Sequence, residues 1–338
     1  MDDWADPGAH EVSDGVFRIP LSMPSDGLRA VNVYALETGD GLVLVDAGWR
    51  TSTSLAELES ALAGVGQNAA SVRDVYVTHI HRDHYTLAVE LRRRFGTRIG
   101  LGRDEMPGLY ELLEIASNVP VTSLQQLRRS GDSTLADTIE ARTAAEEFDA
   151  AAWEKPDSWL DPGEYAVGAR VLEAVATPGH TKGHLVFHDH AGGALFAGDH
   201  LLPTISPSIG FELGGWDLPL ASYLASLEHI LARPDAMLLP AHGAPAPSAH
   251  ARATELLEHH ETRLSETVTA LDRLGSCATA SQVAQVLTWT RRRRSYADLD
   301  DFNRMIATCE TIAHLDVLVA RGRATVIDDP AGASFSVA

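Results

Sequence analysis

Short hydrophobic runs separated by turn residues dominate the first hundred residues of the chain and predict β-strands. The predicted strands cover 16–19, 31–36, 42–45, 74–78 and 98–101. Gly39-Asp40-Gly41 fits a hairpin turn between the second and third of these strands. Apolar Leu55, Leu58 and Leu62 recur at helical spacing within 54–65, and a second helix is predicted over about 86–95. This region therefore predicts a sheet that includes a β-α-β unit.

The pattern changes twice further along the chain. From about 104 to 159 it becomes helical, acidic and loosely periodic, which predicts an insertion that lies over a site and is not part of a sheet. Strand patterns resume at 169–175, 185–188, 194–197 and 237–239, with glycine-rich turns between them, and predict a second sheet.

A third pattern begins after residue 247. Helical periods at 250–274, 280–288 and 298–321 are followed by a short predicted strand at 324–327, and Thr279 fits the N-cap of the middle helix. Three helices with a terminal β element are typical of a small winged-helix-like unit. The expected fold class is α+β, with a domain at 1–247, including the insertion at 104–159, and a C-terminal domain at 248–338.

Composition narrows the kind of protein. The chain has 338 residues, 45% of them hydrophobic, and a net charge of −20, which argues against a general nucleic-acid binder. The basic run Arg291–Arg294 fits a solvated turn or helix end. Cys277 and Cys309 have no CxxC spacing and are expected to be buried free thiols. The sequence shows no signal peptide and no membrane span, so a cytoplasmic protein without a membrane partner is expected.

The sharpest chemical signal is the segment His79-Ile80-His81-Arg82-Asp83-His84, directly after a predicted strand. A strand exit followed by a turn lets His79 and His81 project together, and the helix that follows brings Asp83 and His84 to a neighbouring position. Imidazole nitrogens and carboxylate oxygens are suitable ligands for Zn²⁺ and similar ions. The segment therefore predicts a metal site.

Three further candidates each lie in a glycine-rich turn after a predicted strand: His180 in Pro178-Gly179-His180-Thr181, Asp199 in Gly198-Asp199-His200, and His242 in Ala241-His242-Gly243. A lone histidine in such a turn is usually a surface residue. Together with the first cluster, however, these residues favour one site built from several strand ends. Asp46 closes the predicted strand 42–45 and is a further candidate for the same site. His200 adjoins Asp199 and is expected to support the ligands.

The order and spacing of these motifs over about 12–247 resemble the metallo-β-lactamase fold superfamily, and in particular its glyoxalase II-like hydrolases. The resemblance implies an αββα sandwich of two sheets with helices outside. It implies that one metal is held by His79, His81 and His180, a second by Asp83, His84 and His242, and that Asp199 bridges them. It also implies that Asp46 is the family's structural aspartate, which supports the ligands from behind. Asp199 stands where many true β-lactamases carry a cysteine, so antibiotic resistance is not expected.

The C-terminal unit resembles the winged-helix-like extension of some family members, including a lactamase-like endoribonuclease branch. Its helices more often form a packing or homodimer contact than a reader of nucleic acid.

The leading functional hypothesis is a hydrolase with two divalent metal ions that cleaves an ester-like acyl bond of a small molecule: a thioester, lactone or carboxylic ester. Asp83 is the expected catalytic residue, because it can orient the attacking water and exchange its proton. Zn is the expected metal, although Fe and Mn accept the same ligands. The alternatives are a phosphodiesterase or endoribonuclease with the same two metals, and a non-catalytic binding or regulatory module. The sequence identifies no substrate-binding residue.

Overall fold

The computed structural model describes residues 3–24, 28–209, 217–275, 277–329 and 332–338. Its larger sheet has seven strands in sequence order: β1 (His10–Ser13), β2 (Val16–Ser22), β3 (Ala30–Thr38), β4 (Gly41–Val45), β5 (Val72–Val77), β6 (Arg98–Gly102) and β7 (Ser158–Leu160). The first four strands pair antiparallel, and β4 to β7 pair parallel. The crossovers from β4 to β5 and from β5 to β6 contain α1 (Ser54–Gly64) and α2 (Arg82–Phe95).

The second sheet has five strands in the order β12-β11-β10-β9-β8. These are β8 (Gly163–Val167), β9 (Arg170–Ala176), β10 (Leu185–Asp189), β11 (Ala194–Gly198) and β12 (Met237–Pro240). Strand β10 is buried along its whole length, as expected for a strand covered on both faces.

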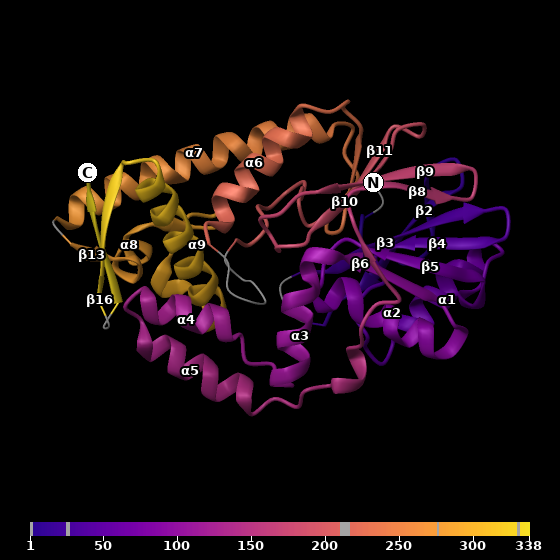
Figure 1. Cartoon of the computed structure of the whole chain (residues 1–338), viewed down its shortest axis with the longest axis horizontal. Helices are drawn as coiled ribbons and strands as arrows, with labels where there is room; N and C mark the ends of the chain where they lie inside the picture. The colour runs from indigo at the N-terminus through magenta and orange to yellow at the C-terminus, as the bar shows by residue number, and fades with distance from the viewer. Residues whose placement is uncertain (1–2, 25–27, 210–216, 276, 330–331) are drawn as a thin grey trace.

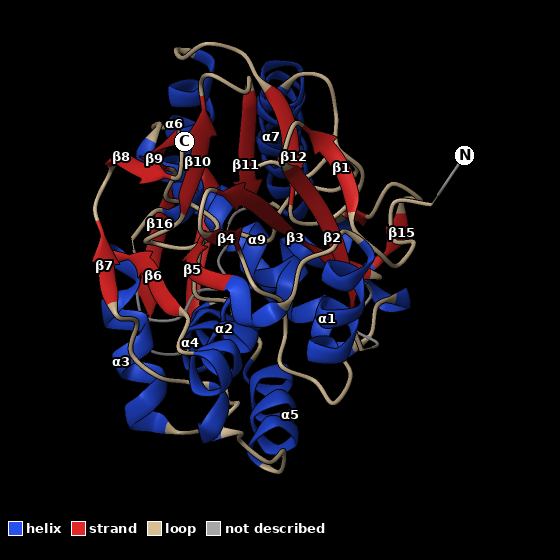
Figure 2. Cartoon of the chain, turned by 90° about the vertical axis from the view of Figure 1, so that its right-hand side faces the viewer, coloured by secondary structure: helices blue, strands red, loops and turns tan. Residues whose placement is uncertain are grey.

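Three hydrophobic cores define the layers around the two sheets. Tyr34, Val43, Phe187 and Phe196 belong to a core shared by the two sheets. The other face of the larger sheet packs against α1 and α2, and the other face of the smaller sheet packs against α6 (Pro219–Leu231) and α7 (Ala249–Leu274). Helices therefore cover two face-to-face sheets, which confirms the expected αββα sandwich (Figures 1 and 2).

The predicted insertion forms η2 (Arg103–Glu105), α3 (Met106–Ile115), α4 (Val121–Arg129), α5 (Ser133–Ala144) and η3 (Ala150–Ala152). Its predicted end at Trp159 is wrong, because Ser158–Leu160 pairs with β6 as the edge strand β7. Three residues are too few to show strand periodicity. Helices α4 and α5 do not remain isolated, since Leu127 and Ile139 share a core with Met305 and Cys309 of α9 (Asp301–Ala320) (Figure 1).

The C-terminal part contains the predicted helices and a small sheet. After α7 follow β13 (Ala278–Thr279), α8 (Ala280–Val286), β14 (Thr288–Trp289), β15 (Arg294–Ser295), η4 (Tyr296–Asp298), α9, β16 (Ala324–Asp329) and β17 (Gly332–Val337). Thr279 caps α8 with a reciprocal capping box to Gln282. Strands β13, β17 and β16 form a three-stranded sheet. The α+β class with a mainly helical C-terminal region is therefore confirmed.

Two further expectations bear on this region. Cys309 is buried, but the expectation of a buried Cys277 is wrong, because this thiol is exposed beside β13. The basic side chains Arg291–Arg294 are exposed around the turn that joins β14 to β15. Among the described residues, no helix has both the length and the apolar character needed to cross a lipid bilayer.

Candidate metal centre

The expected ligands lie where strands of both sheets end. His79 follows β5, His180 follows β9, Asp199 follows β11 and His242 follows β12. Strands β4 and β5 are parallel neighbours, and so are β11 and β12, which places their carboxyl ends at common edges. The fold therefore brings the expected metal ligands together from four separate loops.

His79, His81 and His180 form a first trio of potential ligands. Nε2 of His79 lies 3.0 Å from Nδ1 of His81, and Nε2 of His180 lies 3.1 Å from the same nitrogen. Ligand atoms at about 2.0–2.1 Å from one tetrahedral zinc ion are about 3.3 Å apart, so this spacing suits a single ion.

Asp83, His84 and His242 form a second trio. Oδ2 of Asp83 lies 3.3 Å from Nε2 of His242 and 3.6 Å from Nε2 of His84. These three residues are contributed by the first turn of α2 and the loop after β12.

The Asp199 carboxylate lies between the trios. Its Oδ2 is 3.3 Å from Nε2 of His180 in the first trio. Its Oδ1 is 3.4 Å from Nε2 of His242 and 3.6 Å from Nε2 of His84 in the second. One oxygen therefore faces each trio, an arrangement suited to a bridging ligand.

Hydrogen bonds on the far side of the rings select which nitrogen faces the centre. Nδ1 of His180 lies 2.9 Å from the Ser208 carbonyl, and Nδ1 of His242 lies 2.8 Å from the Ala30 carbonyl. A carbonyl only accepts, so each Nδ1 carries the proton and donates it. Nε2 of His180 and His242 is then left as the donor atom for a metal, as in many protein metal sites.

Asp46 supports one ligand in each trio. This residue is buried and has a φ of 59°, a left-handed conformation that aspartate tolerates better than most residues. Its Oδ2 accepts a hydrogen bond from Nδ1 of His84 at 2.8 Å, and its carboxylate also accepts bonds from the backbone and hydroxyl of Thr78. The same hydroxyl lies 3.0 Å from Nδ1 of His79. Asp46 therefore orients His84 directly and His79 through Thr78.

The local charges also suit cation binding. Burial opposes a charge on His84, but the neighbouring carboxylates of Asp46, Asp83 and Asp199 prevail and raise its pKa to about 10. Burial likewise opposes ionisation of Asp83, yet His84 and His242 hold its pKa well below the ordinary range. The pKa of His81 is lowered to about 3 by burial and by His180.

Three buried atoms facing the centre have no hydrogen-bond partner among the described residues: Nε2 of His84, Nε2 of His242 and Oδ1 of Asp199. Buried polar atoms are usually paired, and leaving one unpaired is costly. Imidazole nitrogens and carboxylate oxygens are the donors that divalent zinc, iron and manganese accept. The residues present therefore fit metal ions in both trios.

His200, expected to support the ligands, is fully buried next to Asp199. Its carbonyl accepts a hydrogen bond from the hydroxyl of Tyr223 at 2.9 Å. Burial and the nearby His180 lower the pKa of His200 to about 3, so its ring is neutral.

Three features near the centre were not predicted from the sequence. Thr78 links Asp46 to His79, and Glu105 is buried against the loop of His180. The guanidinium of Arg82 lies 3.9 Å from the ring centroid of Trp49, within the ligand segment itself. Only Thr78 carried a usable signal, since it ends a predicted strand immediately before His79.

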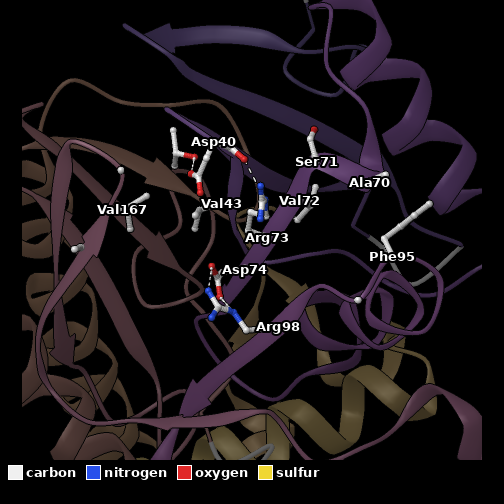
Figure 3. A pocket seen from close by; sticks show the side chains of 14 residues that line it. Asp40, Val43, Ala70, Ser71, Val72, Arg73, Asp74, Phe95, Arg98 and Val167 are labelled. Carbon is white, nitrogen blue, oxygen red and sulfur yellow. Dashed lines mark hydrogen bonds and ion pairs between the residues drawn. The ribbon is translucent and has the colours of Figure 1, made fainter.

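A separate cavity of about 570 Å³ lies at the opposite ends of β5 and β6. Val43, Val72, Phe95 and Val167 contribute its apolar walls, and Arg98 pairs with Asp74 at 2.7 Å (Figure 3). None of the seven expected ligands lines this cavity. It is therefore distinct from the metal centre.

Comparisons with known proteins agree with the fold. Residues 26–242 match the family model of the metallo-beta-lactamase superfamily. The chain is 26% identical to a probable metallo-hydrolase of Bacillus subtilis, over 89% of this chain and 92% of that protein. It is 25% identical to an atrochrysone carboxyl ACP thioesterase of Paecilomyces divaricatus, over 79% of this chain and 68% of that protein.

A solved structure extends the similarity to the C-terminal part. The crystal structure of a metallo-beta-lactamase family protein from Thermus thermophilus is similar with a TM-score of 0.77 and 26% identity. The similarity covers 96% of this chain and 99% of that one.

Proposed function

The chain belongs to the metallo-beta-lactamase superfamily and is a metal-dependent hydrolase; from this premise we propose that it holds two divalent metal ions and cleaves an ester-like acyl bond of a small molecule. The position of Asp199 carries the two-ion proposal. Its two carboxylate oxygens face separate trios of potential ligands, His79, His81 and His180 on one side and Asp83, His84 and His242 on the other.

When bound, divalent ions would lower the pKa of a water at the centre toward neutrality and polarise a substrate carbonyl. The histidines of the two trios would hold the ions, and Asp46 keeps His84 oriented through Nδ1. Asp83 is ionised at neutral pH because its pKa is held low, so it can accept the proton of the attacking water. As the new C–O bond forms and the bond to the leaving group breaks, Asp83 returns this proton to the leaving group.

The substrate class is proposed on two grounds. The thioesterase among the relatives supports a thioester, or a chemically similar lactone or carboxylic ester. The net charge of −20 disfavours a polyanion such as RNA, and the exposed Arg291–Arg294 run is a single basic turn. We further propose zinc as the metal, because it suits imidazole and carboxylate ligands. We also propose a cytoplasmic location, because the two cysteines of the sequence lack the spacing of a disulfide framework.

A substrate panel tests this function. Protein loaded with zinc is assayed on small thioesters, lactones, carboxylic esters and a phosphodiester, with single-stranded RNA as a further substrate. We expect acyl hydrolysis that a chelator removes and added zinc restores. Asp83→Ala is expected to lower kcat by at least about 100-fold, because it removes both a ligand and the proton acceptor.

Metal content is measured on every sample, so that loss of the ion is separated from loss of the proton acceptor. Phosphodiester or RNA cleavage without acyl hydrolysis would replace the proposal with the nuclease alternative. Binding of a single ion per fully active chain would contradict the two-ion centre.

A further inference from the structure

Glu105 is a carboxylic acid buried beside the first trio of ligands. It lies in the η2 turn after β6, with only 2% of its surface exposed, although Arg103 and Asp104 before it are exposed. Burial raises the pKa of Glu105 to about 7, despite hydrogen bonds that favour the ionised form. Burying a carboxyl group costs free energy unless its oxygens accept hydrogen bonds.

The partners of Glu105 belong to both loops that carry the first trio. The hydroxyl of Thr181 donates a hydrogen bond to Oε1 of Glu105, and Thr181 directly follows His180. The backbone N–H of Ile80, between His79 and His81, faces the Glu105 carboxyl group and favours its ionised form. One side chain therefore connects two loops that lie about a hundred residues apart in the sequence.

Two glycines allow the loops to approach this closely. A Cβ on Gly183 would lie 2.3 Å from the backbone nitrogen of Glu105. A Cβ on Gly102 would lie 2.2 Å from the carbonyl oxygen of Gly183. Both distances are too short for a real side chain, so the turn of Glu105 and the loop of His180 are packed backbone against backbone.

We propose that Glu105 is a positioning residue that holds the His180 loop against the His79–His81 loop and so sets the geometry of the first metal trio. Without this connection each loop remains folded, but the three nitrogens are no longer held at the spacing one ion needs. Partners of this kind behind metal ligands change metal affinity by about 10- to 100-fold when removed. The inference rests on the proposed metal centre and is independent of which bond the enzyme cleaves.

Metal affinity of the full-length protein tests the proposal. Glu105→Ala, Glu105→Gln, Thr181→Val and the exposed neighbour control Asp104→Asn are titrated with zinc against a chromophoric chelator. We expect Asp104→Asn to match wild type. Glu105→Ala is expected to weaken one ion by about 10- to 100-fold and to leave the other within a few-fold. Glu105→Gln is expected to lose less, because its amide oxygen can still accept the hydrogen bond from Thr181.

A purely structural role is separated by two further readouts. The visible spectrum of the cobalt-loaded protein reports the geometry at the ion, and it should change in Glu105→Ala. The melting temperature of the metal-free protein reports folding alone. Glu105→Ala that lowers this temperature but keeps the wild-type spectrum and zinc affinity would overturn the proposal.

Thr181→Val provides a test that leaves the Glu105 carboxyl group in place. Its zinc affinity should fall in the same direction, and the double variant with Glu105→Ala should lose less than the sum of the two single losses. Fully additive losses would also overturn the proposal. If the wild-type protein binds only one ion, the proposed two-ion function is contradicted. The ratio of variant to wild-type affinity for that one ion still tests the positioning role of Glu105.

Discussion

At the residue scale, Asp46 shows how one buried carboxylate serves two potential metal sites. It accepts hydrogen bonds from Thr78 and from Nδ1 of His84, and Thr78 in turn contacts His79. The expectation that this aspartate lies near the site came from its place at the end of a strand. Its connection to a ligand of each trio depends on side-chain contacts that no sequence pattern specifies.

Replacement of Asp46 by asparagine should weaken metal binding. An amide in place of the carboxylate cannot accept all the hydrogen bonds that Thr78 and His84 donate, so both ligands lose part of their orientation. We expect zinc affinity to fall by about 10- to 100-fold for Asp46→Asn, measured by chelator competition. Asp40→Asn, in an exposed turn, is the control and should match wild type. Equal affinities for the two variants would show that Asp46 does not orient the ligands.

Metal binding should release protons at neutral pH. The pKa of His84 is raised to about 10, so in the metal-free protein this ring is protonated at pH 7 and its second proton is on Nε2, facing the centre. A metal ion must displace that proton. As pH rises toward 10 the proton competes less, so the apparent zinc affinity should increase with pH.

Calorimetric titrations at pH 7 in buffers of different ionisation enthalpy measure the number of protons released. The assignment of a positive charge to His84 would be contradicted if zinc binding released almost no protons and the zinc affinity stayed constant from about pH 6 to about pH 9.

At the scale of elements, the insertion is joined to the C-terminal helices. Arg129 at the end of α4 forms two hydrogen bonds with Asp316 of α9, at 2.8 and 2.9 Å. Leu127 of α4 and Cys309 of α9 also share a hydrophobic core. Both a charged pair and apolar contacts therefore join α4 to α9.

Breaking this pair should destabilise the protein. Arg129→Ala leaves Asp316 without its partner in a partly buried place, and we expect a loss of about 1–3 kcal/mol in the free energy of unfolding. The neighbouring Arg128 pairs with Glu140 at the surface, so Arg128→Ala should cost less than about 0.5 kcal/mol. Urea denaturation measures both. Similar losses for the two variants would mean that α4 is not held through Arg129.

At the scale of the whole molecule, the catalytic and C-terminal parts share a hydrophobic core. Val186 of β10 and Leu227 of α6 belong to the same buried cluster as Leu256 of α7 and Leu315 of α9 (Figure 1). The domain boundary near residue 247 therefore remains a prediction from the sequence. The hydrophobic core extends across this boundary. Apolar contacts of this extent couple the folding of the parts that make them.

Cooperative unfolding follows from the shared core. We expect one transition for the metal-free protein in differential scanning calorimetry, with equal calorimetric and van't Hoff enthalpies. A chain ending at residue 247 should expose Val186 and Leu227 and aggregate. Two separate transitions, or a stable and monodisperse 1–247 fragment, would support two independent domains instead.

The sequence alone determined the features that depend only on residues close to one another along the chain. The period of the apolar positions predicted the strands around β3 to β5 and the helices α7 and α9, because burial of one face repeats along an element. The ligand segment His79–His84 was recognisable for the same reason, since a strand exit and the first turn of a helix bring its side chains together locally.

Only the tertiary structure decided which distant groups meet. Glu105 lies in an acidic, helix-rich stretch that is typical of a solvated surface, yet it is buried against Thr181, 76 residues away. Ser158–Leu160 became a strand because β6 offers it an open edge, and Cys277 is exposed immediately before β13, which is an edge strand of its small sheet. Contacts between distant segments decide which side chains are buried and which hydrogen bonds they form. A local sequence pattern does not specify those contacts.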